Sequence, residues 1–229
     1  MNPLDGLATA HLADALVRLG RPPRLAPFGL VPVQAGMRAA GRALPCRHRG
    51  SVDVFLERID SARAGDVLVV DDAGGTGAGC VGDLVVREAR AAGLGGLVVF
   101  GAHRDTAELR EIGFPVFSLG RFPAGPTRVE PRREGDLERA RVGEVEVSAG
   151  EFVLADDDGV VFLSAEDADE VLGLARTIAA TERAQAERLA GGESLREQLA
   201  FAEFLARREA DPGRSFREHL IEIGGAIET

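Results

Sequence analysis

A strand, helix, strand pattern in the first half of the chain constrains the fold more than any other feature of the sequence. Residues 66–70 and 97–100 are short apolar runs typical of buried strands, and residues 84–92 between them have helical spacing that ends before Gly93. Two parallel strands need a crossover of this kind, which is almost always right-handed. The pattern predicts an α/β fold built on a parallel sheet.

Each of these two strands is followed by a polar segment. Residues 71–82 are rich in glycine and are predicted to form a loop, and residues 101–105 are predicted to form a second loop. Ligands of open α/β sheets bind beyond the carboxyl ends of the strands. We therefore expect the functional site where these two segments meet.

Periodicity and chain-breaking residues predict the other elements. The final third is expected to be mainly helical. The predicted elements are an amphipathic helix at 9–19, a short strand running into a helix around Val52, Val54, Phe55 and Ile59, a helix at 106–112, a strand starting at 114–117, short strands at 142–147, 152–155 and 160–162 with a turn at 156–159, a helix from 164–167 to about Leu189, a helix at 195–209, and a helix capped at 215–218 that ends at Gly224 and Gly225.

Length and composition limit the class of protein. A chain of 229 residues with 45% hydrophobic content can bury one sizeable core, and we expect an α/β domain at 1–190 and a helical extension at 191–229. A net charge of -10 argues against general electrostatic binding of nucleic acid. No apolar run is long enough to cross a membrane, and no signal-like segment opens the sequence. With two cysteines outside any CxxC motif, these features lead us to expect a cytoplasmic protein.

The glycine-rich segment permits two interpretations. Residues 77–82 match the glycine spacing of dinucleotide-binding loops, but no acidic residue closes the second strand to hold a ribose hydroxyl. Alternatively, the backbone amides of Gly82, Asp83 and Leu84 at a helix start could hold a carboxylate. Arg104 beside Asp105 would then supply donors for an oxyanion and a hard oxygen ligand for a divalent metal.

Structural roles are also possible for the same residue types. An Arg-Asp pair at a strand end is often a salt bridge, and Cys80 is more typical of a packing residue than of a nucleophile. Asp71 and Asp72 could approach a metal, although capping of the strand end is the simpler role. The acidic residues at 156–158 lack the spacing of a calcium loop.

One spacing resembles a known family. Asp83, twenty residues, Arg104-Asp105, two residues and Glu108 resemble the D-X20-R-D-X2-E/D pattern of the 4-hydroxy-4-methyl-2-oxoglutarate aldolases. That family also includes the non-catalytic regulator of ribonuclease activity A. The resemblance spans roughly residues 9–175.

The resemblance implies an α/β sandwich of the swivelling phosphohistidine-domain type, assembled as a homotrimer or hexamer with sites between subunits. It implies that Asp105 ligates Mg²⁺ or Mn²⁺ and that Asp83 and Glu108 hold metal-bound waters. The amides of Gly82, Asp83 and Leu84 would take the substrate carboxylate, and Arg104 would stabilise an enolate. The implied reaction cleaves a 4-hydroxy-2-oxo acid to pyruvate, or decarboxylates oxaloacetate, without a Schiff-base lysine; this chain contains no lysine.

Departures from the family pattern leave alternatives open. His103 stands where a small or apolar residue is expected, so it either contacts substrate or satisfies a hydrogen bond of the loop. The helical tail is longer than in minimal family members, which leaves open which acid a neighbouring subunit contributes. A non-catalytic regulator is the main alternative function, although the regulator lacks the metal-binding aspartate. A specialised 2-oxo acid substrate is a further alternative.

Overall fold

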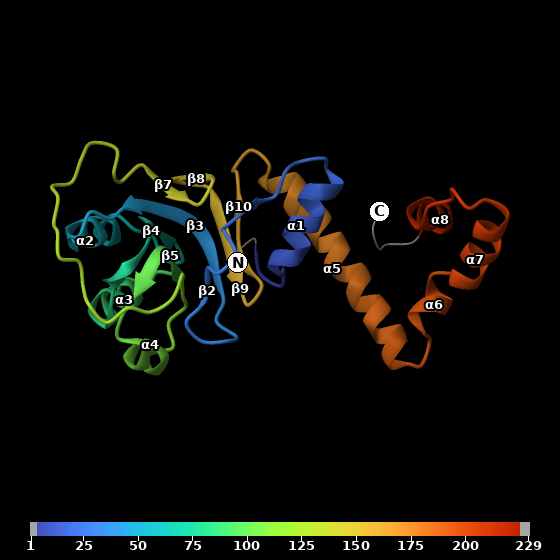
Figure 1. Ribbon diagram of the computed structural model, residues 1–229, viewed down its shortest axis with the longest axis horizontal. Helices are drawn as coiled ribbons and strands as arrows, with labels where there is room; N and C mark the ends of the chain where they lie inside the picture. Colours follow the sequence, from blue (N-terminus) through green and yellow to red (C-terminus); the bar gives the residue numbers. More distant parts are fainter. Residues whose placement is uncertain (1–3, 225–229) are drawn as a thin grey trace.

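A computed structural model describes residues 4–224 and has a mixed α/β architecture around one large sheet (Figure 1). The sheet has eight strands in the order β1-β10-β9-β3-β4-β5-β6-β2, while β7 and β8 form a separate two-stranded ribbon. The four strands from β3 to β6 are parallel and the flanking strands antiparallel, so the predicted α/β fold with a parallel sheet is confirmed. The strands are β1 (Arg24–Leu25), β2 (Val31–Pro32), β3 (Ala39–Arg47), β4 (Val67–Val81), β5 (Gly96–His103), β6 (Val116–Ser118), β7 (Arg139–Val142), β8 (Val145–Ser148), β9 (Phe152–Asp156) and β10 (Gly159–Leu163).

The parallel centre of the sheet holds the larger hydrophobic core. Val69 of β4 lies opposite Pro45 of β3 and Val98 of β5, and the side chains of β4 from Val67 to Val70 are fully buried. Strands covered on both faces need continuous apolar runs, which explains the pattern seen in the sequence. The helices that follow these strands are α2 (Asp53–Asp60), α3 (Asp83–Ala91) and α4 (Thr106–Ile112).

The antiparallel flank carries a second core under two helices. In Figure 1, α1 (Thr9–Arg18) and α5 (Ala168–Ala190) lie together beside β9 and β10. Their apolar faces, with Leu12 and Val171 among the buried residues, close over those strands. The backbone amide of Thr9 donates to the Asp156 carboxylate at 2.8 Å, which fixes the start of α1. Neither α5, with 23 residues, nor any other helix in the described range is long and apolar enough to cross a membrane.

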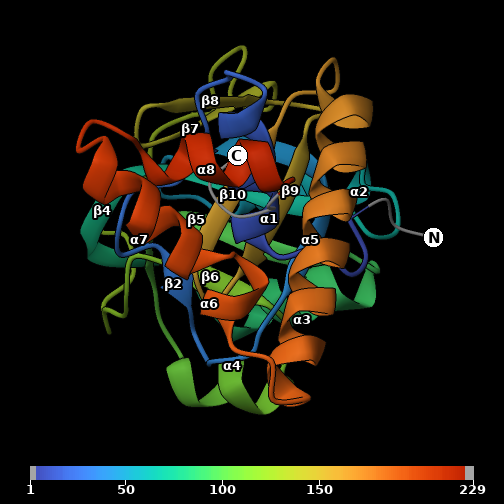
Figure 2. The same cartoon turned by 90° about the vertical axis from the view of Figure 1, so that its right-hand side faces the viewer.

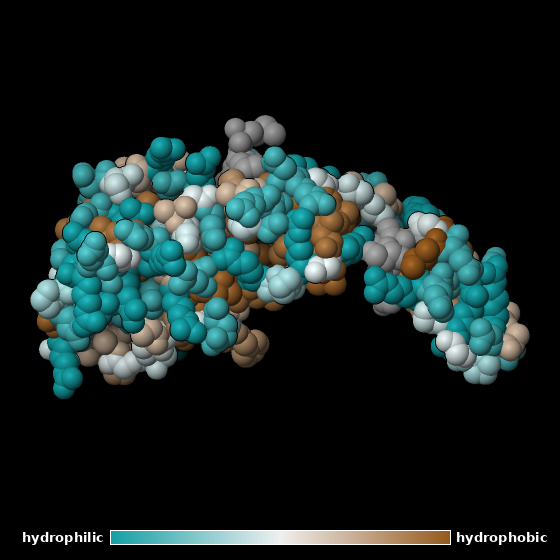
Figure 3. Space-filling view, turned by 90° about the horizontal axis from the view of Figure 1, so that it is seen from above, coloured by the Kyte–Doolittle hydropathy of each residue, from teal (hydrophilic) through white to brown (hydrophobic). Residues whose placement is uncertain are grey.

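The last three helices form an arm beyond the far end of α5. They are α6 (Leu195–Gln198), α7 (Phe201–Ala210) and α8 (Phe216–Ile223). In Figure 1 they stand away from the sheet, and the view in Figure 2 is from the side of the arm, which lies in front of the sheet. Seen from above, the arm is a narrow projection from the body (Figure 3). It has a small core of its own, in which the rings of Phe204, Phe216 and His219 contact one another, Phe216 stacked on His219 and edge-on to Phe204. Of the predicted end at Gly224 and Gly225, Gly225 lies outside the described residues.

Three expectations about the first half of the chain need correction. The segment at 71–82 is not a plain loop, because β4 continues to Val81, with register shifts against β5 between Asp71 and Gly75, Gly75 and Gly79, and Gly79 and Val81. Such bulges lengthen one strand against its partner and re-aim the backbone. β5 likewise continues to His103. The strand before α2 is Ala39–Arg47 rather than residues around Val52, because its small and charged residues hide the apolar pattern.

Two later elements are divided where one was predicted. Residues 142–147 are parts of the hairpin β7-β8, which turns at Gly143 with φ 62°. The predicted helix at 195–209 breaks between α6 and α7, where Ala200 has φ 46°. A left-handed residue cannot continue a right-handed helix, so the chain changes direction there.

Candidate functional site

The Arg104-Asp105 pair lies at the carboxyl end of β5, beside the end of β4. The Arg104 amide donates to the Val81 carbonyl at 2.9 Å, which ties the pair to the neighbouring strand. Asp105 then starts α4 in the left-handed conformation, with φ 59° and ψ 43°. This conformation is uncommon for a residue other than glycine, and such strain is often found at functional sites.

Three glycines make room for this pair. A Cβ atom at Gly82 would lie 2.3 Å from Asp105 Oδ2, one at Gly79 would lie 2.9 Å from Arg104 Cβ, and one at Gly125 would lie 2.8 Å from Arg104 Nη1. A side chain at any of them would displace the Arg104-Asp105 pair. Gly79 and Gly82, both in the glycine-rich segment, therefore let the backbone approach the Arg104-Asp105 pair closely.

The amino terminus of α3 faces the same place. Gly82 is its N-cap residue and makes no side-chain hydrogen bond. The amide of Asp83 reaches Asp105 Oδ2 at 3.3 Å, and the first intrahelical bond runs from Val86 to the Gly82 carbonyl. The amides of the first helical turn are free of intrahelical partners by geometry and attract negative charge.

The three acidic residues of the predicted motif lie on two elements. Asp105 Oδ2 lies 3.6 Å from Arg104 Nε, and their side chains are 37% and 47% exposed. The Asp83 carboxylate, in the first turn of α3, accepts from Arg87 Nε at 3.3 Å. Glu108 is exposed in the first turn of α4. Carboxylate oxygens suit a hard cation such as Mg²⁺, which is commonly bound by one or two carboxylates and several waters. Within residues 4–224, however, Asp83, Asp105 and Glu108 do not gather as a group of possible ligand atoms within 4.8 Å of one another.

His103 is held within its own chain on both sides of the ring. Its Nδ1 lies 2.7 Å from Ser118 Oγ and its Nε2 lies 3.0 Å from Thr106 Oγ1. Burial lowers the pKa of His103, and the nearby Arg121 and Arg110 lower it further. The neutral ring joins the end of β5 to β6 and to the start of α4. Leu84, by contrast, is 76% exposed beside the α3 amides.

The structure adds residues that sequence reasoning did not connect to this site. The segment after β6 returns over the glycine-rich strand, since the Gly79 amide donates to the Ala124 carbonyl at 2.8 Å and the Phe122 amide donates to the His103 carbonyl. This segment carries Gly125. No local pattern marks it, because its contacts are with residues more than fifteen positions away.

Asp71 and Asp72, for which the sequence leaves capping or a metal site open, have different partners. The Asp71 carboxylate accepts from the Ala73 and Arg141 amides, which is a capping role. Asp72 pairs with the imidazole of His48 at 2.8 Å. His48 was not singled out in the sequence, because nothing in its own segment points to Asp72.

The fold and the strand-end site together define the class of protein. The sequence model of the RraA-like family, described as Aldolase/RraA, matches residues 9–162, more than half of the chain. The chain belongs to the RraA-like family.

Two curated relatives are similar to this chain in sequence, and one of them is named as an aldolase. The 4-hydroxy-4-methyl-2-oxoglutarate aldolase of Thermus thermophilus is 36% identical over 126 residues, covering 55% of this chain and 76% of the relative. Protein DlpA of Legionella pneumophila is 28% identical over 194 residues, covering 82% of this chain but only 31% of DlpA.

One similar solved structure is named after an inhibitor family instead. Streptomyces coelicolor RraAS2, described as an unusual member of the RNase ES inhibitor RraA protein family, matches with a TM-score of 0.67 at 29% identity, covering 82% of this chain and 93% of RraAS2. Since aldolases and ribonuclease inhibitors both occur among these relatives, family membership alone does not choose between catalysis and regulation.

Proposed function

We propose that this chain is a divalent-metal-dependent carbon-carbon lyase acting on a 2-oxo acid. The observation that carries the proposal is that Arg104 and Asp105 lie against the amino terminus of α3, where only a glycine at position 82 leaves room for them. The proposed reaction is retro-aldol cleavage of 4-hydroxy-4-methyl-2-oxoglutarate, or a related 4-hydroxy-2-oxo acid, to pyruvate. Decarboxylation of oxaloacetate requires the same charge stabilisation and is included.

The residues of the chain would bind and polarise the pyruvyl half of the substrate. The first-turn amides at Gly82, Asp83 and Leu84 would hold its carboxylate. Arg104, with its side chain 47% exposed, would donate to the 2-oxo oxygen, where negative charge develops as the bond between C3 and C4 breaks. The leaving fragment departs as a carbonyl compound once its hydroxyl has lost its proton to solvent, and the remaining enolate takes a proton from solvent at C3 to give pyruvate.

Asp105 would hold Mg²⁺ or Mn²⁺ directly, and Asp83 and Glu108 would orient water around it. Bound there, the metal would act as a Lewis acid toward the 2-oxo and carboxylate oxygens. His103 enters the proposal as a positioning residue, because both of its ring nitrogens already have partners in β6 and α4.

A homotrimer or hexamer is part of the proposal. The side of the site beside Leu84 is open, with that apolar side chain 76% exposed. A large exposed apolar residue beside donor amides is suited to a subunit contact that closes the site. Neither a nucleic acid nor a membrane partner is proposed.

The second candidate is a non-catalytic regulator that acts by protein contact. The inhibitor name carried by RraAS2 supports it. The Arg104-Asp105 pair argues for catalysis, since a protein that acts only by contact does not require a partly exposed carboxylate in a strained left-handed position. A specialised 2-oxo acid substrate would use the same site.

The deciding experiment is pyruvate release from oxaloacetate and from 4-hydroxy-4-methyl-2-oxoglutarate, with Mg²⁺ and with EDTA. We expect metal-dependent turnover that Asp105→Ala lowers by at least about a hundredfold, the size typical for loss of one key stabilising group. Glu111→Ala, an exposed change on the same helix α4, should leave the rate unchanged. Absence of turnover with either compound, together with absence of Mg²⁺ binding, would favour the regulator.

A further inference from the structure

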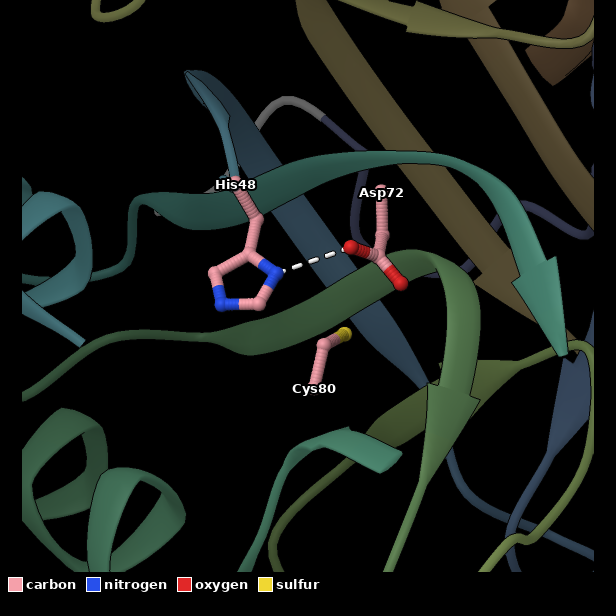
Figure 4. Close-up of side chains that lie close together, drawn as sticks. All are labelled: His48, Asp72 and Cys80. Atoms are coloured by element: carbon pink, nitrogen blue, oxygen red, sulfur yellow. Dashed lines mark hydrogen bonds and ion pairs between the residues drawn. The ribbon is translucent and has the colours of Figure 1, made fainter. Parts of the chain in front are cut away.

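A second group of potential metal ligands contains none of the residues proposed to hold Mg²⁺. His48 follows the end of β3, and Asp72 and Cys80 belong to the two ends of the irregular part of β4 (Figure 4). One ligand atom from each lies within 4.8 Å of the other two, and His48 Nδ1 is 2.8 Å from Asp72 Oδ1. In Figure 4 the imidazole, the carboxylate and the sulfur converge on one space between the strands.

This group is enclosed by the protein. The side chains of His48 and Asp72 are 1% and 18% exposed, and Cys80 is buried. The imidazole stacks on Phe55 with ring centroids 5.0 Å apart. Its Nε2 has no hydrogen-bond partner within residues 4–224, so Asp72 is the side chain that fixes the ring by a hydrogen bond.

Nucleophilic catalysis is a poor explanation of the group. Burial raises the pKa of the Cys80 thiol well above its usual value, and the neighbouring Asp72 carboxylate raises it further. A nucleophilic cysteine requires the opposite shift, toward the thiolate. The thiol is therefore protonated when no cation is near.

We infer that His48, Asp72 and Cys80 form a binding site for a zinc-class transition-metal ion, distinct from the magnesium-type site at Asp105. Thiolate, imidazole and carboxylate together select Zn²⁺ and similar borderline-soft ions, whereas Mg²⁺ prefers oxygen alone. Tetrahedral zinc separates its ligand atoms by about 3.3 to 3.8 Å. The observed separations, up to 4.8 Å, approach that range with small side-chain movements.

Charge balance supports the same ion. On binding, the Cys80 thiol loses its proton to solvent, and the sulfur lone pair forms a bond to the metal without any change of oxidation state. His48 stays neutral, with its proton on Nε2 so that Nδ1 becomes a ligand. A thiolate, a carboxylate and a dication sum to zero, which reduces the cost of burial. Water would complete the fourth position.

The ion would connect both ends of the glycine-rich part of β4. Asp72 precedes this segment and Cys80 follows it, two residues before Gly82. Binding to the folded state alone would raise the melting temperature. Because the imidazole lacks the usual outer partner on Nε2, we expect weaker binding than in a structural zinc centre.

The test uses the reduced full-length protein, stripped with EDTA and titrated with Co²⁺ and then with Zn²⁺. With excess Mg²⁺ present to fill the proposed Asp105 site, we expect a thiolate-to-cobalt charge-transfer absorption that saturates at one Co²⁺ per chain and disappears when Zn²⁺ displaces Co²⁺. Cys80→Ala should abolish the absorption. Cys46→Ala, a change at the other buried cysteine, is the matched control and should retain it.

Two further variants keep the outcome decisive. His48→Gln should remove or strongly weaken the absorption and provides a second test should Cys80→Ala fail to fold. Asp105→Ala should keep the absorption even though it removes the proposed lyase activity, which separates the two sites. Absence of the absorption in the wild type, its survival in folded Cys80→Ala, or its loss in folded Cys46→Ala would overturn the inference.

Discussion

At the scale of single residues, Gly82 tests how closely the backbone must approach Asp105. Gly82→Ala would place a methyl group 2.3 Å from Asp105 Oδ2, while its own backbone conformation, φ -131°, is open to alanine. We expect pyruvate release to fall at least about tenfold, because displacing a catalytic group such as the Asp105 carboxylate by about 1 Å lowers the rate strongly. Steady-state kinetics measures this loss.

Gly77→Ala is the matched control for that substitution. It lies in the same glycine-rich strand, but a Cβ there meets nothing within 4 Å. Its rate should equal that of the wild type. Equal rates in both variants would show that the approach at Gly82 is not needed for activity.

Asp136 predicts a pH dependence of stability. Its carboxylate accepts from Arg49 at 2.6 and 2.9 Å and from the Arg133 amide at 2.7 Å, and the hydrogen bond from Arg49 lowers its pKa. A lowered folded-state pKa adds stability above the unfolded value, 3.8, and this stability is lost as the pH falls through the folded pKa.

Asp136→Asn should therefore destabilise the protein at pH 7, by about 3 kcal/mol as for other buried ion pairs. The difference from the wild type should shrink as the pH falls below about 4. Urea unfolding at several pH values measures it. Glu144→Gln, whose side chain is 95% exposed, should change stability by less than about 0.5 kcal/mol. A pH-independent loss in Asp136→Asn would contradict the assignment.

At the scale of elements, α8 depends on its cap. Ser215 Oγ accepts from the Glu218 amide at 3.2 Å, and Glu218 Oε2 accepts from the Ser215 amide and hydroxyl at 2.9 Å. Ser215→Ala should destabilise α8 by about 1 kcal/mol. Because the arm has a core of its own, the loss should appear as faster hydrogen exchange in α8 while β4 and β5 stay protected. Ser61→Ala, at the end of α2, serves as the control and should leave exchange in α8 unaltered.

At the scale of the whole molecule, the arm poses the question of domain organisation. Its buried side chains, Leu199, Phe204 and Leu220, lie outside both hydrophobic clusters of the body. We propose that residues 1–190 form the family domain and 191–229 an extension. A fragment ending at residue 190 should then fold and unfold cooperatively, as measured by circular dichroism and calorimetry. An unfolded fragment would mean that the arm belongs to the folding unit.

Light scattering on the full chain and on the same fragment tests the assembly. We expect the mass of a trimer or a hexamer for the full chain. If the sheet body makes the subunit contacts, the fragment keeps the same number of subunits. A monomeric full chain would contradict the proposed assembly.

The sequence by itself determined the features that arise from local pattern. Alternation and apolar runs located β4, α3 and β5, and chain breakers located the turn at 156–159 and the end of α5. The spacing from Asp83 to Glu108 identified the family. It could do so because the motif residues stand at fixed positions relative to the end of β5 and the start of α3. These signals depend on neighbours in the chain, so they are readable without coordinates.

Tertiary structure alone decided what lies across the fold. It brought Gly125 to Arg104, joined His48 to Asp72 and Cys80, and held His103 from two sides. It also extended β4 through the glycine-rich segment and bent the chain at Ala200. Each of these depends on long-range packing and on backbone pairing between distant segments, where local propensity is a weak guide.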